Sequence, residues 1–389
     1  MIIELHLLHS FPASNLNRDD VGQPKSVMFG GALRGRISSQ CLKRSARELF
    51  ERHGLDTSET GLRTKRLLLH TARTLDGIDD EEQDPSEQTA NVVREALRQL
   101  GFEFKDNDLT EYLLFVGRTA VDTLAGFCRD HWDGLEQAMR ARSEAEKAKK
   151  GSTKKQAPVK VVSDKEAAAI GNDVLRADRA ADIALFGRMI ADNKAFNVEA
   201  SSQVAHAFST HAASTEFDYY TAVDDLKKDD EPGADMIGTV DFNAACYYRY
   251  ANLDLNQLQK NLAGDGDLAQ RATRAWLESF IRARPSGKQN STAALTNPDT
   301  LVTVVREHGS WNLANAFLEP VTGETVMTTS TKHMLDHLAR LRDFYGDEEI
   351  RAVTATSVSG DVPVLDDTEK VSRMRDLVDR TVSAGWETA

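Results

Sequence analysis

Two adjacent acidic residues, Asp19 and Asp20, are the first side chains of the sequence that could do chemistry. A pair of carboxylates can hold a divalent cation for phosphodiester cleavage. Neighbouring side chains point in different directions on most backbones, however, and no third acid accompanies this pair locally. We therefore expect a loop cap or an ion pair with Arg18 here, rather than a metal site.

The glycine-rich segment GGALRGRI has some of the features of a phosphate-binding P-loop, because Gly30 and Gly35 have the required spacing. The next two residues are Arg36 and Ile37, where a P-loop has Lys and then Ser or Thr. Both the lysine that neutralises nucleotide phosphates and the hydroxyl that holds magnesium are missing. The segment therefore argues against a nucleoside triphosphatase.

Cysteine and histidine residues do not form a recognisable site. Cys41, Cys128 and Cys246 lie far apart without a CxxC pair, which argues against a disulfide framework or a cysteine zinc site. His333 and His337 share a helix face, but no further ligands complete a set around them. We expect no metal and no cofactor.

The residues after the glycine turn suit phosphate binding without catalysis. Ser38, Ser39 and Gln40 offer neutral donors at the start of a predicted helix, where the helix dipole favours a phosphate group. Lys43 and Arg47 follow four residues apart and share one face of that helix. Such a surface grips a sugar-phosphate backbone and reads little of its base sequence.

The charge of the chain is distributed unevenly. The formal net charge is −13, yet residues 17–47 carry +5 and residues 139–160 carry +6, so the remainder carries −24. An acidic body argues against indiscriminate nucleic-acid binding, whereas two local basic stretches indicate defined sites for polyanions. The alternative is that both stretches are solvated faces.

Three side chains in segments outside the basic stretches could stack on nucleic-acid bases: Met189, Tyr219 and Tyr220. Stacking of a base on an aromatic ring contributes about 1–3 kcal/mol. Packing into the protein core is the alternative for each of the three.

Periodicity indicates a mixed fold. Residues 2–8 alternate as a strand does, with Ile3 and Leu5 on one side and Glu4 and His6 on the other. A long loop over 10–37 leads to a helix that Ser38 or Ser39 can cap and Gly54 can end. Further helices are expected over 58–148 and near 163–178, 267–284, 328–345 and 366–384, and further strands at 182–190, 204–213, 239–253 and 301–307.

Strands separated by helices, with hairpin-like neighbours, favour an α+β protein with an antiparallel sheet, a helical insertion and a protruding arm. Pro232-Gly233 lies in an acidic run that marks the exposed tip of the arm. No apolar run approaches the roughly 20 residues that span a bilayer, and no signal peptide is evident. We expect a soluble intracellular protein.

Several motifs together resemble the backbone subunit (the CasC family) of the type I-E CRISPR surveillance complex, Cascade. The first block reads LNRDD, then K-x3-FGG, then R-x-R-ISSQ-x-LKR. The resemblance continues through DIALFGRM, SQVAHAFSTH, FDYYTAVDDL, YYRYANLDLNQL, KQNSTAA and WNLANAFLEPV, and it covers nearly the whole chain except residues 55–160. One departure is KQNSTAA, where relatives often carry KQRTYAA.

The resemblance implies a fold like a right hand. Its RRM-like (ferredoxin-like) palm would comprise residues 1–57, 179–212 and 244–389, with the flanking helices. Helical fingers would be inserted at 58–178, and a β-hairpin thumb would cover 213–243.

The resemblance also implies a non-catalytic scaffold, not an enzyme, in prokaryotic cytoplasm. Copies of the subunit, expected as a hexameric helical array, would line the guide RNA, kink it and present it for pairing with target DNA in antiviral defence. Its partners would be guide RNA, target DNA, other copies of itself, the large and small subunits, a guide-end capping subunit and a guide-processing endoribonuclease. A helicase-nuclease would be recruited indirectly.

Site residues follow from the matched motifs, position by position. The implied RNA-binding residues are Arg18, Lys25, Ser38, Gln40, Lys43, Arg47, Met189, Tyr219, Tyr220, Met236, Ile237, Lys288 and Gln289. The implied DNA-binding residues are Lys147, Lys149, Lys150, Lys154 and Lys155.

Two other functions stay open. Related subunits of type III complexes cut RNA with a loop aspartate, so a metal-dependent ribonuclease using Asp19 or Asp20 is one alternative. A purely protein-binding adaptor is the other, and it predicts that no guide RNA co-purifies.

Overall fold

The structure is a computed structural model that describes residues 1–80, 82–102, 104, 108–148, 159–190, 197–222, 236–360 and 362–387. For residues 146–148, 222, 236 and 237 it describes the backbone alone. Backbone contacts divide the chain into two compact units. Unit 1 comprises residues 1–55, 201–260 and 265–389, and unit 2 comprises residues 56–200 and 261–264.

Unit 1 is built on one large antiparallel sheet, which has nine strands in the described residues. Seven follow the path β11-β10-β1-β9-β7-β3-β2, and β6 and β8 also pair with β9. Its strands are β1 (Ile2–Ser14), β2 (Ser26–Phe29), β3 (Ala32–Ile37), β6 (Ser202–Val204), β7 (Ala207–Ser209), β8 (Glu216–Ala222), β9 (Met236–Asp254), β10 (Thr300–Arg306) and β11 (Ile350–Ser357). The α+β class with an antiparallel sheet is confirmed.

Helices accompany this sheet. They are α1 (Ser39–Arg47), α8 (Leu255–Asn261), α9 (Gly266–Arg282), α10 (Gln289–Thr292), α11 (Val326–Tyr345) and α12 (Met374–Trp386), with short 3-10 turns η1 (Phe50–His53), η4 (Leu313–Phe317) and η5 (Asp367–Glu369). The last residue of α8, Asn261, belongs to unit 2. The sequence predicted that Gly54 ends the helix begun at Ser38 or Ser39, but α1 already ends at Arg47, and Gly54 ends the separate turn η1 with a φ of 99°.

The alternation of β1 is confirmed: the strand lies between β9 and β10, and the side chains of both of its faces are buried. Leu8 belongs to a core cluster with Leu335 of α11 and Phe317 of η4 on one side of the sheet. On the other side, Ile3 lies against Gly385 of α12, and the Thr303 and Thr381 hydroxyls are 2.7 Å apart. Helices thus cover both faces of the sheet.

Glu4 and His6 on β1 are buried, and each forms side-chain hydrogen bonds. Burial raises the pKa of Glu4 to about 7, although its carboxylate accepts hydrogen bonds from the Trp311 backbone and the Tyr250 hydroxyl. Burial lowers the pKa of His6 to about 3, and its Nδ1 lies 2.9 Å from the Tyr248 hydroxyl. These groups fix the register of the central strands.

Residues 10–37 are not the long loop that the sequence suggested. β1 continues to Ser14, and β2 and β3 form a hairpin joined by Gly30 and Gly31, which have φ values of 58° and 75°. Two left-handed residues make the tight turn that suits a two-residue hairpin, and glycine adopts that conformation without strain. The glycine-rich segment is therefore a strand turn.

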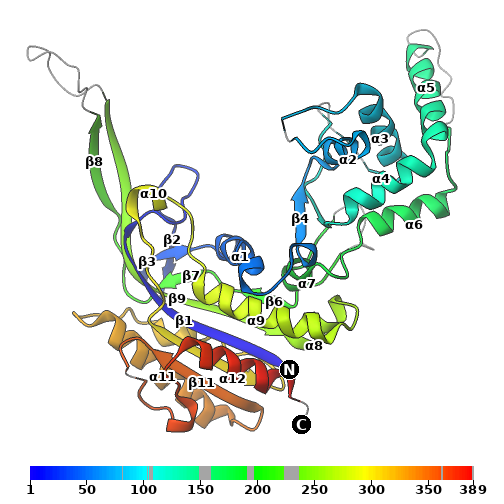
Figure 1. Ribbon diagram of the computed structural model, residues 1–389. Coiled ribbons are helices and arrows are strands. Elements are labelled where there is room, and N and C mark those ends of the chain that lie inside the picture. Colours follow the sequence, from blue (N-terminus) through cyan, green and yellow to red (C-terminus); the bar gives the residue numbers. More distant parts are fainter. Residues whose placement is uncertain are drawn as a thin grey trace, which may run out of the picture. The chain divides into compact units, whose positions relative to one another are not determined.

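The arm expected near 213–243 is a hairpin of β8 and the first part of β9, running from the Glu216↔Phe242 pair to the Ala222↔Met236 pair. Figure 1 shows these strands leaving the rest of the sheet of unit 1 as a two-stranded ribbon. The tip of the arm, including Pro232-Gly233, lies outside the described residues.

Unit 2 is mostly helical and also contains a two-stranded sheet. Its elements are η2 (Thr57–Glu59), β4 (Gly61–Thr64), α2 (Leu67–Asp76), α3 (Glu87–Gln99), β5 (Leu114–Gly117), α4 (Ala120–Asp130), α5 (Trp132–Ala148), α6 (Asp164–Val174) and α7 (Ala181–Phe186). The expectation of helices throughout 58–148 misses the β4–β5 pair. Val92, Leu97, Leu124 and Leu135 belong to one buried cluster that joins α3, α4 and α5.

The strand expected at 182–190 is wrong. Residues 181–186 form the short helix α7, in which every residue is buried, so the segment has no polar alternation to distinguish a strand from a helix. The Asp182 carboxylate accepts hydrogen bonds from the backbone N–H groups of Gly61 and Ile183. These contacts place residues 179–200 in unit 2, whereas the implied palm included 179–212.

In the part of the chain that the structure describes, no helix combines the length and apolar composition needed to cross a bilayer. Within the same residues, no group of three or more His, Cys, Asp or Glu side chains is arranged to hold a metal ion.

Candidate nucleic-acid interface

One face of α1 carries three of the predicted RNA-binding side chains. Gln40, Lys43 and Arg47 follow one another at spacings of three and four residues, so they form a stripe along the helix. Gln40 is exposed, and Lys43 and Arg47 are half-buried. Leu42 and Ala46 face the core and fix the orientation of the helix.

The start of α1 is held by a loop from elsewhere in unit 1. Ser38 is the N-cap, and its hydroxyl accepts a hydrogen bond from the Cys41 N–H at 3.3 Å. The Asn17 carboxamide oxygen accepts from the Ser38 N–H at 2.8 Å. Ser38 is only 5% exposed, so its main observed role is to begin the helix.

Lys25 lies beside this helix start. Its backbone N–H donates to Asn17, and its carbonyl accepts from the Arg36 N–H at 2.8 Å. His206 Nδ1 accepts from the Ser39 N–H at 3.0 Å. Burial lowers the pKa of His206, and the positive charges of Arg36 and Lys25 lower it further. The positive charges of Arg36 and Lys25 therefore act on the His206 imidazole at the start of α1.

Arg18 is exposed on the neighbouring loop, where it forms a backbone bridge with Pro24. The next residue, Asp19, folds this loop: one of its carboxylate oxygens accepts from the N–H groups of Val21 at 3.0 Å and Gln23 at 2.9 Å. The predicted loop cap is thus confirmed for Asp19.

Arg34 does not contribute to the positive surface, although it counts toward the +5 of its stretch. It is fully buried, and its guanidinium donates to the carbonyl oxygens of Ser209 and Phe317, both at 2.9 Å, and of Leu318 at 3.4 Å. Burial also lowers its pKa. Arg34 therefore connects β3 with β7 and with the end of η4.

The loop around α10 adjoins the same region. A Cβ on Gly287 would lie 2.3 Å from the carbonyl oxygen of Leu16, so the loop packs directly on residues 15–16. Lys288 is half-buried and adopts a φ of 54°. The Gln289 amide nitrogen donates to Pro285 at 2.9 Å and Ala294 at 3.2 Å, so its side chain closes the loop.

Strand β8 carries the predicted aromatic pair on opposite faces, because successive strand residues alternate. Tyr219 is 74% exposed. Tyr220 is 48% exposed, and it also covers Gly238 on the facing strand, where a Cβ would lie 2.3 Å from its ring. Phe217 shares the face of Tyr219 and is 63% exposed. Sequence reasoning missed Phe217, although its i−2 spacing from Tyr219 was a usable signal. The side chains of Met236 and Ile237 lie outside the described residues.

Met189 belongs to unit 2 and is 85% exposed, which excludes the alternative that it packs in the core. Its neighbour Arg188 points inward and donates to the carbonyl oxygens of Phe115 and Leu175 at 2.9 and 2.8 Å. The backbone of Arg188, the residue before Met189, forms an antiparallel β-bridge with Val198. Met189 is therefore an apolar side chain held at the surface by a buried arginine.

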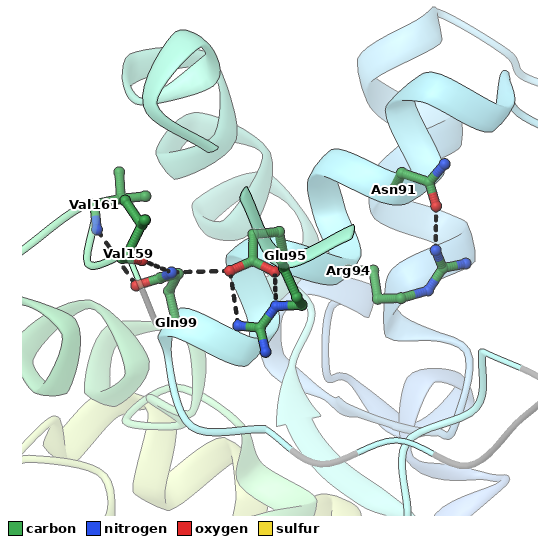
Figure 2. A network of polar contacts seen from close by, with 7 residues as sticks. Asn91, Arg94, Glu95, Gln99, Val159 and Val161 are labelled. Carbon is green, nitrogen blue, oxygen red and sulfur yellow. Dashed lines mark hydrogen bonds and ion pairs between the residues drawn. The ribbon is translucent and has the colours of Figure 1, made fainter. Parts of the chain in front are cut away.

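The structure does not describe the side chains of the lysines implied for DNA binding. Lys149, Lys150, Lys154 and Lys155 lie outside the described residues, and Lys147 is described by its backbone in α5 alone. Another cation of the same stretch, Arg142, is committed to Glu95, with guanidinium–carboxylate contacts of 2.8 and 3.0 Å. Figure 2 shows Glu95 and Gln99, whose side-chain amide nitrogen donates to the Glu95 carboxylate and to the Val159 carbonyl oxygen.

Comparison with known families decides the relationship that the motifs suggested. A model of the Cas_CT1975 family, described as CT1975-like protein, matches residues 3–380. The chain belongs to the Cas_CT1975 family. A search of the curated proteins found no match.

Two solved structures share the fold of this Cas_CT1975 chain. A chain of a "CRISPR RNA-guided surveillance complex, pre-nicking" is 28% identical with a TM-score of 0.84, and the match covers 99% of this chain and 100% of the other. A chain of a "CRISPR RNA-guided surveillance complex" is 24% identical with a TM-score of 0.74 and the same coverage, a level at which the likeness concerns the fold alone. The chain is thus a Cas-family protein with the fold of CRISPR surveillance-complex subunits.

Proposed function

We propose that the protein is a non-catalytic scaffold that binds guide RNA in a type I-E Cascade complex. Several copies polymerise along the guide as a hexameric helical array, kink it and present it for pairing with target DNA. The observation that carries this proposal is the α1 face, where Gln40, Lys43 and Arg47 form one stripe beside Lys25 and Arg18.

This surface has the properties that phosphate binding requires. Lysine and arginine neutralise phosphate charge, and the carboxamide of Gln40 is a neutral donor. One of the two acids in the same loop, Asp19, accepts hydrogen bonds from backbone N–H groups, and the other, Asp20, is exposed. The strongly acidic remainder of the chain disfavours indiscriminate binding of nucleic acid elsewhere.

The exposed apolar residues supply the second part of the proposed function. Met189 and Tyr219 are large apolar side chains at the surface, which suits them to wedge beside or stack on bases. Phe217 extends the face of Tyr219. Met236 and Ile237 are proposed to act at the same hairpin, on the strength of the motif resemblance.

The proposed partners follow from the complex. They are guide RNA, target DNA, further copies of the chain, the large and small subunits, a guide-end capping subunit and a guide-processing endoribonuclease, in prokaryotic cytoplasm. A helicase-nuclease joins indirectly. This assignment is supported by the similarity to chains of RNA-guided surveillance complexes.

Replacing Lys43 and Arg47 together by alanine tests the proposal. We expect assembly on guide RNA to weaken across guide sequences, and the salt dependence of binding to fall by about 0.7 for each phosphate of single-stranded RNA that the variant no longer neutralises. The control is Arg375→Ala with Arg380→Ala on α12, which removes the same charge from exposed positions. Unchanged assembly of the Lys43/Arg47 variant would contradict the assignment.

A ribonuclease is the alternative, and the geometry of Asp19 disfavours it because that carboxylate already caps a turn. Incubation of the purified complex with matched RNA and magnesium distinguishes the two functions. We expect intact RNA; cleavage abolished in Asp19→Ala or Asp20→Ala would replace the scaffold with a nuclease. The adaptor alternative predicts a preparation without nucleic acid, which the absorbance ratio at 260 and 280 nm reports.

The stacking face can be tested with matched aromatic variants. Phe217→Ala and Tyr219→Ala should each disturb base spacing along the guide, because they remove rings from one exposed face. Tyr220→Ala should instead lower stability, because its ring covers Gly238. Chemical probing of the guide reads the first effect, and thermal unfolding reads the second. Equal probing patterns for all three variants would reject this division of roles.

A further inference from the structure

A buried carboxylate of unit 1 holds residues 307–313, the connecting segment between β10 and η4. Glu4 on β1 is fully buried, and its Oε1 accepts hydrogen bonds from the Trp311 backbone N–H and, at 3.3 Å, from the Tyr250 hydroxyl. Its other oxygen, Oε2, is also buried and has no hydrogen-bond partner among the described residues. The connecting segment is therefore attached to the sheet through an acid that water does not reach.

The connecting segment has few other attachments to the sheet. Apart from Trp311 and Leu313, all of its residues are exposed. The Leu313 N–H donates to the Tyr248 hydroxyl at 2.9 Å, and the Asn252 carboxamide nitrogen donates to the Ser310 hydroxyl at 3.3 Å. A segment with so few buried contacts can open locally while the structure around it persists.

The charge on Glu4 is subject to opposing influences. The positive charge of Arg306 and the two hydrogen bonds that Glu4 accepts favour the ionised carboxylate, but burial outweighs them and raises the pKa from its ordinary value of 4.5 to about 7. The Arg306 guanidinium itself lies 3.8 Å from the centre of the Trp311 ring and 3.7 Å from the Glu349 carboxylate. The ionised form of Glu4 therefore lacks the water that would stabilise it.

The other buried titratable groups beside Glu4 keep one charge state near neutral pH. Burial lowers the pKa of His6 to about 3, so its imidazole is neutral. Burial raises the pKa of Tyr248 and of Tyr250 above the ordinary value, so both phenols stay protonated. Glu307 and His308 are exposed titratable side chains of the connecting segment itself, and each requires a control variant.

We propose that protonation of Glu4 controls the connecting segment: the protonated carboxyl group keeps residues 307–313 on the sheet, and its ionisation releases them. Release restores water to the carboxylate, so in the released state the pKa of Glu4 returns to its ordinary value. Because the closed state binds the proton more tightly, release becomes more favourable as pH rises. The difference between 4.5 and about 7 limits the total change in the opening equilibrium to about 300-fold.

Release of the connecting segment changes an exposed aromatic surface. The centres of the Trp311 and Tyr345 rings are 6.1 Å apart, and those of Tyr345 and Phe344 are 4.9 Å apart. Tyr345 and Phe344, at the end of α11, are 67% and 79% exposed. The proton on a buried side chain thus determines whether Trp311 stays beside these two rings.

Hydrogen exchange of the full chain at about pH 6 and about pH 8.5 tests the proposal. Protection factors remove the intrinsic pH dependence of exchange and report the opening equilibrium. Opening at the Trp311 and Leu313 amides should increase on the order of tenfold over this interval, whereas the amides of β10 should not follow. Unchanged protection at Trp311 and Leu313 would overturn the proposal, and so would an equal change in β10, which would indicate unfolding of the whole sheet.

Matched variants identify the group that titrates. Glu4→Gln retains an oxygen that can accept from the Trp311 N–H but cannot ionise, so the tenfold change should disappear. Glu307→Gln and His308→Asn should each keep it, since they alter only exposed side chains of the segment. Wild-type pH dependence in Glu4→Gln, or its loss in either control, rejects the assignment to Glu4.

A second variant keeps the test valid if Glu4→Gln does not fold. Tyr250→Phe removes a hydrogen bond that favours the ionised carboxylate, so the pKa of Glu4 should rise further. The pH at which opening of the connecting segment levels off should then move upward. A midpoint that stays constant or moves downward in Tyr250→Phe contradicts the proposal.

Discussion

The chain has two basic stretches, residues 17–47 and 139–160, and their basic side chains lie in different surroundings in the fold. In the first, Arg34 is buried, while Gln40, Lys43 and Arg47 form a stripe on α1 next to Lys25. In the second, Arg142 is bound to Glu95, and Lys160 pairs with Asp164 at 2.6 Å. Similar charge in the sequence thus yields a coherent surface in one stretch and ion pairs with acids of the same unit in the described part of the other.

The difference follows from what the neighbouring elements offer. Buried carbonyl oxygens at the ends of β7 and η4 can be satisfied by one long guanidinium, and Arg34 satisfies them. Glu95 is 2% exposed on α3 and needs a cation close by, which Arg142 provides. A charge count along the sequence cannot tell such structural arginines from those that meet a ligand.

Among the variants that test this comparison, removal of Arg34 should change the free energy of unfolding most. Arg34→Ala leaves buried carbonyl oxygens without donors and should lower the free energy of unfolding of unit 1 by about 3–5 kcal/mol. Urea unfolding followed by circular dichroism measures it. Arg36→Ala is the matched control, because Arg36 is half-buried and should cost about 0.5 kcal/mol while weakening RNA binding. Equal stability of the two variants would contradict the structural role of Arg34.

Arg142 should behave in the same way in unit 2, with a smaller effect because a third of its side chain is exposed. Arg142→Ala leaves the Glu95 carboxylate buried and should destabilise unit 2 by about 2–3 kcal/mol. Glu95→Gln with Arg142→Ala removes the uncompensated charge and should recover part of the stability. Urea unfolding of both variants checks this, and a stability close to wild type in the single variant would speak against the pair.

The smallest expected effect is a change in the pKa of His206, which depends on the charges at the start of α1. Lys25→Ala removes a nearby positive charge that lowers the His206 pKa, so that pKa should rise. Binding of a short RNA to wild type should raise it too, since phosphate offsets Lys25 and Arg36. NMR titration of the imidazole follows both changes. A pKa that falls or stays constant in both experiments would place the phosphates elsewhere.

Patterned elements were predictable from the sequence, and elements fixed by tertiary contacts were not. The alternation of Ile3 and Glu4 and the cap at Ser38 follow from local rules, and both are confirmed. The helix at 181–186 was missed because its six residues are all buried, and a short apolar run does not reveal its periodicity. Strand β11 (Ile350–Ser357) has no counterpart among the expected strands, since its pairing with β10 is a long-range contact.

The candidate site shows the same division. The helical spacing of Gln40, Lys43 and Arg47 was readable, and so was the turn cap at Asp19. The burial of Arg34 depends on Ser209 and Phe317, which are distant in sequence. The contact between the Tyr220 ring and Gly238 depends on the pairing of β8 with β9, which adjacent letters do not reveal.

The central claim is that the α1 face of unit 1 holds guide-RNA phosphates. An experimental structure of the chain assembled on guide RNA tests it directly. We expect phosphate oxygens within hydrogen-bond distance of the Lys43 and Arg47 side chains in each copy. An α1 face that meets solvent or a protein neighbour, with no nucleotide beside Lys43, would contradict the account.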